Sequence, residues 1–176
     1  GSLRVSEVGI QNDEALFSAG IYPPFGPSPE IFGHHYPMMV MTYVGALKAF
    51  LYRPIFWIWP PSAASVRIPA ILLGGLTVWL FYVLVKRTLD TETALFAAAL
   101  LATDSSFLLT ARWDWGPVAI QHLCMVGGVL AIVRFAQSLK LSWLFVGFFA
   151  FGLGIWDKAI FAWSVVGLGM AVLAVF

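Results

Sequence analysis

The sequence predicts an all-α, polytopic membrane protein with about five spanning helices and interfacial juxtamembrane helices beside them. Hydrophobic residues make up 60% of the 176 residues, and charged residues only 11%. A soluble domain usually carries about 25% charged residues. The mean hydropathy is +0.87. A soluble protein of this size has too little interior for so much apolar surface. The basic residues are scattered along the chain, which argues against a nucleic-acid-binding protein.

The first unit, residues 1–61, is interpreted as an extracytoplasmic loop with juxtamembrane helices. Residues 38–53 combine an apolar face with polar positions at helical spacing, which is typical of an amphipathic helix. A spanning helix needs about 20 apolar residues, and Pro54 ends this segment before that length. We therefore expect 38–53 to lie on the membrane surface. The positions assigned to its polar face are Thr42, Gly45, Lys48 and Tyr52.

The second unit, residues 62–176, is predicted to form the transmembrane helical bundle. Its apolar stretches are separated by short polar connections, as expected for neighbouring antiparallel helices. The second stretch is interrupted at Asp104, where the two readings are an intramembrane functional acid and a local helix break. The fourth is short for a bilayer. The expected spans are residues 67–86, 93–111, 117–137, 141–156 and 159–176.

The basic residues predict the orientation of these spans, because short loops rich in Lys and Arg remain cytoplasmic. Two such loops, two crossings apart, carry Lys86 with Arg87, and Arg134 with Lys140. The remaining basic residues then lie outside, against the rule, and a bound anion is one reason for such a placement. These outside residues are Arg67, Arg112 and Lys158.

The interfacial segment decides whether the acidic residues share one side of the membrane. If 38–53 does not span, Asp13 lies on the same side as Asp114 and Lys158. If it spans, Asp13 lies on the opposite side, and these residues cannot form one active site.

Several polar residues have both a structural and a functional interpretation. Asp13 and Glu14 suit a helix start, but they also suit a catalytic or metal-binding site. Asp114 pairs with Arg112 in the loop or acts as a second site carboxylate, since two carboxylates can divide acid and base roles. Lys158 snorkels or pairs with its neighbour, or it faces a lipid phosphate.

The pair His34-His35 lies where the first loop returns to the membrane. In extended backbone one of two adjacent histidines can act as a ligand, and imidazole with carboxylate suits a divalent metal such as zinc. The alternative is a histidine pair with no special role.

The order of five short motifs resembles the GT-C superfamily of membrane glycosyltransferases. The closest branch is the protein O-mannosyltransferase and lipid A aminoarabinose transferase type, and the likeness covers the N-terminal half of such a protein. The motifs are Gln11-Asn12-Asp13-Glu14-Ala15, His34-His35-Tyr36-Pro37, Val66-Arg67-Ile68-Pro69-Ala70, Leu101-Ala102-Thr103 through Ala111-Arg112-Trp113-Asp114, and Gly152-Leu153-Gly154 through Asp157-Lys158-Ala159.

The resemblance implies an inverting transfer of a sugar from a polyprenyl-phosphate donor to a hydroxyl on a protein or glycolipid. It implies a multi-pass protein of the bacterial inner membrane with its active site facing outward. Asp13 would be the general base, with Glu14 beside it and Asp114 as the second acid. His35 matches the place of a metal ligand, for a divalent cation of unknown identity. Donor binding is assigned to Lys158, which would hold the phosphate, and to Arg112, Tyr36 and Arg67.

The chain departs from the family pattern at several positions. Tyr36 stands where some members have a phosphate-binding Lys, and Asp157 replaces the usual Thr before Lys158. The family pattern also leads us to expect a helix before Asp13 and further helices after residue 176. These departures leave a second hypothesis open, that of a non-catalytic membrane scaffold or lipid-handling subunit derived from the same fold.

Overall fold

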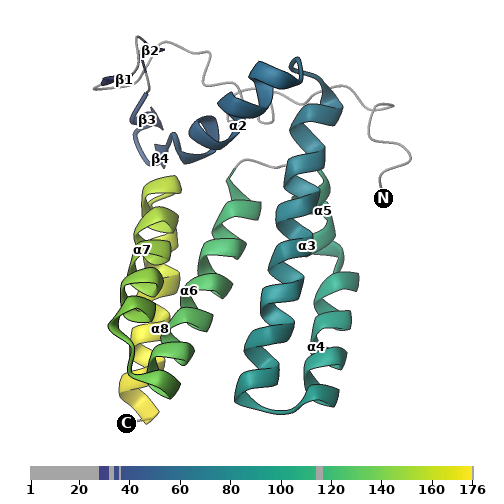
Figure 1. The fold of residues 1–176 in the computed structure, drawn as a ribbon, viewed down its shortest axis with the longest axis vertical. Helices are drawn as coiled ribbons and strands as arrows, with labels where there is room; N and C mark the ends of the chain where they lie inside the picture. The colour runs from purple at the N-terminus through teal and green to yellow at the C-terminus, as the bar shows by residue number, and fades with distance from the viewer. Residues whose placement is uncertain (1–27, 32–33, 36, 114–116, 176) are drawn as a thin grey trace.

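The computed structural model of the protein describes residues 28–31, 34–35, 37–113 and 117–175. These residues form an up-and-down helical bundle capped at one end by two small hairpins and a crossing helix (Figure 1). The first hairpin pairs β1 (Glu30–Ile31) with β2 (His34–His35), and the second pairs β3 (Met39–Met41) with β4 (Val44–Gly45), both antiparallel.

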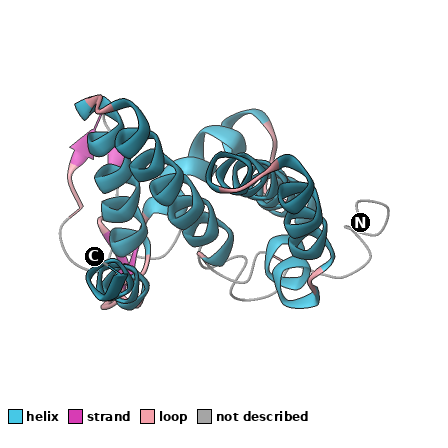
Figure 2. Ribbon diagram, turned by 90° about the horizontal axis from the view of Figure 1, so that it is seen from below, coloured by secondary structure: helices cyan, strands magenta, loops and turns pink. Residues whose placement is uncertain are grey.

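The bundle itself is made of apolar helices that run between its two ends. In chain order the helices are α2 (Leu47–Ile58), α3 (Ala63–Thr88), α4 (Thr91–Thr103), α5 (Ser105–Arg112), α6 (Val118–Ser138), α7 (Leu141–Asp157) and α8 (Phe161–Val175). Seen from below, α3 packs with α4 and α5 on one side, and α6 connects this group to α7 and α8 (Figure 2). The all-α bundle predicted from composition is confirmed.

Two of these helices, α3 and α6, are long and apolar enough to cross a membrane alone. The pair α4 and α5 forms a third span if its 60° bend is counted within one crossing. The bend lies at Asp104, where the interruption was predicted. A carboxylate oxygen of Asp104 accepts a hydrogen bond from Phe107 N at 2.7 Å and caps the new helix.

The last two helices are apolar but shorter, with 17 residues in α7 and 15 in α8. At 1.5 Å per residue, α7 is about 25 Å long, against about 30 Å for the hydrocarbon core. The short fourth stretch is thus confirmed as a short helix, whereas five complete crossings remain a prediction.

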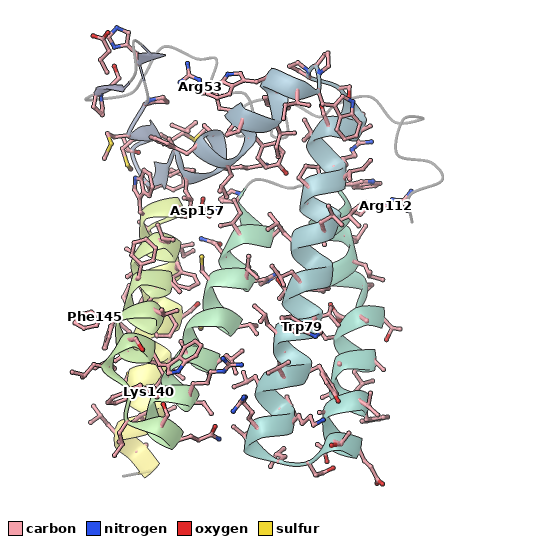
Figure 3. The ribbon with its side chains drawn as sticks, viewed as in Figure 1. Arg53, Trp79, Arg112, Lys140, Phe145 and Asp157 are labelled. Atoms are coloured by element: carbon pink, nitrogen blue, oxygen red, sulfur yellow. The ribbon has the colours of Figure 1, made fainter. Side chains whose placement is uncertain are left out.

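The outer flanks of the bundle carry large apolar side chains that are mostly exposed. Phe145 is 73% exposed and Trp79 59% exposed, and both extend from their helices in Figure 3. Such a surface is unfavourable in water but matches a lipid environment. The flank therefore agrees with the membrane assignment.

The interfacial segment begins later than predicted. Residues 38–53 were expected to form one helix, but residues 39–45 form the second hairpin, and α2 begins at Leu47 and continues through Pro54 to Ile58. Pro54 was expected to end the segment. It lies inside the helix, where its missing N–H leaves one carbonyl without its helical partner.

α2 is oriented with its polar residues Lys48 and Tyr52 toward the protein interior. Its predicted polar positions Lys48 and Tyr52 are buried, while Leu51 is 46% and Ile58 89% exposed. In a membrane the apolar side can face lipid and the polar side must find partners within the protein. This helix therefore turns its polar side inward.

Small residues allow α6, α7 and α8 to approach closely. A side chain at Gly128 would collide with the Phe151 ring, and one at Gly147 with Ile132. Gly152 makes no such close contact, because a Cβ there would meet nothing within 4 Å.

Candidate active site

The end of the bundle that α2 crosses is held together by contacts from α2 to the start of α3. The Tyr52 hydroxyl donates a hydrogen bond to the Val66 carbonyl at 2.9 Å. The Lys48 amino group lies 5.4 Å from the centroid of the Tyr52 ring, one helical turn away. The inward-facing side of α2 is thus fixed over the first turns of α3.

The second hairpin fixes the opposite side of this end, at the C-terminus of α7. Val44 forms an antiparallel bridge with Lys158, and Ala159 N donates to the Tyr43 carbonyl at 3.0 Å. The Trp156 indole N–H donates to the Met38 carbonyl at 3.0 Å. Lys158 therefore leaves α7 in extended backbone, in a position set by two chain segments more than a hundred residues apart.

Close approach between these segments requires a residue without a side chain. A Cβ at Gly45 would collide with the backbone carbonyl of Trp156, so any larger residue there would move the hairpin off α7.

Among the described residues, three side chains that carry a formal charge are buried at this end of the molecule. Lys48 and Arg67 are each 2% exposed, and Asp157 is 0% exposed. Each of them contacts other residues, as burial of a charge requires. Asp157 lies beneath α2 at the upper end of α7 (Figure 3). An acid at a helix C-terminus is unfavourable for the helix dipole, and Asp157 is the last residue of α7.

Two of the predicted donor-binding residues lie on different sides of this end. Lys158 is partly buried at the end of α7, whereas Arg112 is the last residue of α5. Figure 3 shows Arg112 and Asp157 on opposite flanks of the bundle. Arg112 lines a cavity of about 490 Å³ together with Ile71 and Gly74 of α3. The fold thus brings the two cations to one end but not to one point.

Arg67, the third predicted donor-binding cation, lies in the second turn of α3 and points into the protein. Because Arg67 is buried, it would have to contribute to donor binding from inside the bundle, close to the Tyr52–Val66 hydrogen bond.

The predicted metal ligand His35 lies in strand β2 and is exposed. Its ring Nδ1 is 3.5 Å from the Ser28 carbonyl, and its own carbonyl accepts a hydrogen bond from Arg53 at 2.9 Å. Within the part of the chain that the structure describes, no group of three or more His, Cys, Asp or Glu residues is placed to hold a metal ion. No step of the chemistry is therefore assigned to a metal, and the divalent cation stays a prediction.

The other predicted site residues lie outside the described residues. These are the carboxylates Asp13, Glu14 and Asp114, and the aromatic residue Tyr36. Their assignments as base, second acid and donor contact stay predictions from the sequence.

Sequence reasoning missed several residues that build this end. Lys48 and Tyr52 were assigned to a polar face without a function, and Gln121 was not singled out. The Gln121 side-chain amide lies 3.5 Å from the Lys158 carbonyl, in donor geometry. The available signal was polarity within apolar helices, since such residues are costly unless they find protein partners.

These observations define a polytopic membrane protein whose buried charged residues, among those described, gather at one end, next to Lys158 at a helix terminus. The sequence model of the dolichyl-phosphate-mannose-protein mannosyltransferase family matches residues 45–176 of the chain, about three quarters of its length, and the chain belongs to this family. The comparison with curated proteins gave no match, and neither did the comparison with solved structures.

Family membership confirms the GT-C resemblance that the motifs indicated. The protein is a membrane glycosyltransferase of the mannosyltransferase type. The match includes Arg67, Arg112 and Lys158, and begins after the first-loop motifs that hold Asp13 and His35.

Proposed function

We propose that this protein transfers a sugar from a polyprenyl-phosphate carrier to a hydroxyl group of a protein or glycolipid, with inversion at the anomeric carbon. The observation that carries the proposal is the position of Lys158. In a chain of the mannosyltransferase family, the backbone of Lys158 is fixed at the end of α7 by the bridge to Val44 and the adjoining hydrogen bond from Ala159.

The role of Lys158 follows from the charge that develops in the reaction. As the bond between the anomeric carbon and the phosphate oxygen breaks, the phosphate leaves with the electron pair. A cation already positioned at the phosphate oxygens stabilises the transition state more than the ground state. Lys158 follows the last turn of α7 in extended backbone, and a cation at the end of a spanning helix is expected near the lipid headgroups.

Asp13 is proposed as the base that accepts the acceptor's proton. The acceptor oxygen attacks the anomeric carbon, its hydrogen passes to the Asp13 carboxylate, and the polyprenyl phosphate departs from the opposite face. A base must lie within hydrogen-bond reach of the proton that it accepts. Glu14 beside Asp13, together with Asp114, would orient the acceptor and tune the charge of the site.

Arg112 and Tyr36 are proposed as additional donor contacts. Arg67 is proposed to support the donor site from within the bundle, because its guanidinium is buried beside the α2–α3 contact. A divalent cation at His35 would have to complete its ligand set from the first-loop carboxylates.

The proposed orientation of the bundle in the membrane follows from the distribution of basic residues in the sequence. Lys86, Arg87, Arg134 and Lys140 lie at the end of the bundle away from α2. If these mark the cytoplasmic side, the α2 end faces outward, which in a bacterium is the periplasmic face of the inner membrane.

The test is transfer of radiolabelled mannose from polyprenyl-phosphate mannose by the full-length protein in nanodiscs, with peptide and glycolipid acceptors supplied separately. Asp13→Asn should lower the transfer rate by about 100- to 10,000-fold, the usual contribution of a general base. Lys158→Ala should lower kcat/KM for the donor by about 100-fold, and Lys158→Arg should restore part of it.

The matched control for the acid substitution is Glu92→Gln, an exposed acid in the first turn of α4 at the other end of the bundle. This variant should transfer mannose at the unaltered rate. Full activity of Asp13→Asn would overturn the assignment of the base. Absence of transfer by the unaltered protein to either acceptor would overturn the proposed reaction.

A further inference from the structure

The end of the bundle away from α2 carries a connected set of polar residues that the transfer reaction does not use. Arg87 of α3 donates from Nη1 to the Gln137 side-chain oxygen at 3.2 Å, and the Gln137 amide donates back to the Arg87 carbonyl at 3.2 Å. Arg134 lies one turn before Gln137 on the same face of α6. Its guanidinium carbon is 4.5 Å from the centroid of the Trp143 ring in α7.

These four residues, Arg87, Gln137, Arg134 and Trp143, are called the arginine array below. The array links the C-termini of α3 and α6 to the N-terminus of α7, so its arginines are held by neighbouring helices. This organisation distinguishes it from isolated basic residues at a membrane surface.

The surroundings of the array are predominantly basic. Lys86 precedes Arg87, and Lys140 lies in the α6–α7 connection. Within the described residues, the acids at this end are Asp90 and Glu92, both at the start of α4. The Asp90 carboxylate is occupied by the backbone N–H of Thr93 at 2.9 Å and its hydroxyl at 2.6 Å.

The chemistry of the array suits a phosphate. Stacking on Trp143 uses the face of the Arg134 guanidinium, whereas its N–H donors lie in the ring plane and fit the oxygens of a phosphate. The Arg134 Nε is buried and has no hydrogen-bond partner among the described residues, so a phosphate would be bound by the terminal nitrogens of this guanidinium. Arg87, hydrogen-bonded to Gln137 one turn further along α6, supplies a second guanidinium.

The depth of the array also fits a lipid headgroup. Arg134 lies four residues before the end of α6, which is about 6 Å along the axis. This distance is within the polar region that adds about 5–7 Å to each side of the hydrocarbon core. Trp143, in the first turn of α7, is of the residue type enriched at this level of a bilayer.

We propose that the arginine array is a binding site for an anionic phospholipid headgroup of the adjacent leaflet. The lipid phosphate would lie between Arg87 and Arg134, with Lys86 and Lys140 increasing the local positive potential. A zwitterionic lipid binds less tightly, because its own cation is repelled by these residues. This site is separate from the transfer reaction and does not rest on the proposed function.

The test is native mass spectrometry of the full-length protein in detergent, titrated with phosphatidylglycerol or phosphatidylcholine of matched chains. We expect tighter binding of phosphatidylglycerol. Arg134→Gln and Arg87→Gln should each weaken it about fivefold, since a cation near an anionic lipid contributes about that factor. The double variant should weaken it about 25-fold, and Arg134→Lys should lose less than Arg134→Gln.

The matched control is Arg53→Gln, which removes an arginine that bonds the His35 carbonyl at the opposite end. It should leave phosphatidylglycerol affinity unchanged. Equal affinity for the two lipids, or unchanged affinity in the Arg87→Gln and Arg134→Gln double variant, would overturn the proposal. Displacement of the lipid by millimolar inorganic phosphate would also overturn it, because the site would then recognise free phosphate. Lys140→Gln, an exposed change in the α6–α7 connection, provides a second test if an arginine variant does not fold.

Discussion

The docking of α2 can be tested at one hydroxyl group. Tyr52 is 1% exposed, and its hydroxyl reaches the Val66 carbonyl at the start of α3. Tyr52→Phe keeps the ring and its packing and removes only this hydrogen bond. The variant therefore isolates the polar contribution to the contact between the interfacial helix and the bundle.

The expected cost follows from the burial of both partners. A hydrogen bond contributes a net 0.5–1.5 kcal/mol, and leaving a buried acceptor unsatisfied costs about 1–3 kcal/mol. We expect a loss of about 1.4 kcal/mol, which is a tenfold change in an equilibrium constant. Tyr52→Ala also removes the ring, and large-to-small changes at such sites cost about 3–5 kcal/mol.

The measurement is amide hydrogen exchange of α2 in nanodiscs, because local opening of this helix need not unfold the bundle. Tyr52→Phe should speed exchange of α2 amides about tenfold and leave α6 amides unchanged. The control is Tyr43→Phe, which removes a hydroxyl from a side chain that is 54% exposed. Equal exchange rates in Tyr52→Phe and Tyr43→Phe would refute the reasoning.

Three further predictions concern helix packing and capping. Gly128→Val should lower stability by about 1–3 kcal/mol through overpacking against α7, measured as a lower Tm. Gly152→Ala, with open space around it, should not lower Tm. Equal Tm shifts in the two variants would contradict this packing. Asp104→Ala should cost about 1 kcal/mol by removing the cap of α5, and an unchanged Tm would contradict the capping role. Hydrogen bonds from Thr93 lower the pKa of Asp90, so its stabilising effect is present above the usual pKa and is lost as the pH falls through the lowered one. Unfolding midpoints across this acidic range should converge for the unaltered protein and Asp90→Asn, and a constant difference would contradict the linkage.

Much of the bundle was predictable, because the signals are local. Runs of apolar residues marked the helices, and Asp104 marked the bend at which it caps α5. The basic residues of two separate connections were predicted to share one side, and the mutual hydrogen bonds of Arg87 and Gln137 confirm that these ends of α3 and α6 meet.

The start of α2 was not predictable from a helical pattern. Residues 39–45 have apolar residues at spacings that suit a helix, but the hairpin is held by long-range contacts with Trp156 and Lys158. No local pattern reports a partner more than a hundred residues away. The pattern also gave α2 a polar face without showing whether that face meets water or protein.

The candidate site was predictable only in part, because local motifs identify its residues but do not show which of them meet. Short motifs identified Arg67, Arg112 and Lys158, and the helix ends place them at the α2 end of the bundle. Burial of Lys48 and Asp157 depends on how three helices and a hairpin meet, and sequence spacing does not contain that information.

The proposed active site requires the first loop, α2 and Lys158 to share one side of the membrane. Its most direct test is labelling of single cysteines with a membrane-impermeant maleimide in oriented vesicles, in a Cys124→Ala background. Ser18→Cys and Ile58→Cys should react from the same side, and Leu139→Cys, at a position 76% exposed in the α6–α7 connection, only from the other. Reaction of Ser18→Cys and Ile58→Cys from opposite sides would show that the first loop and α2 do not share a side, and would exclude a common active site.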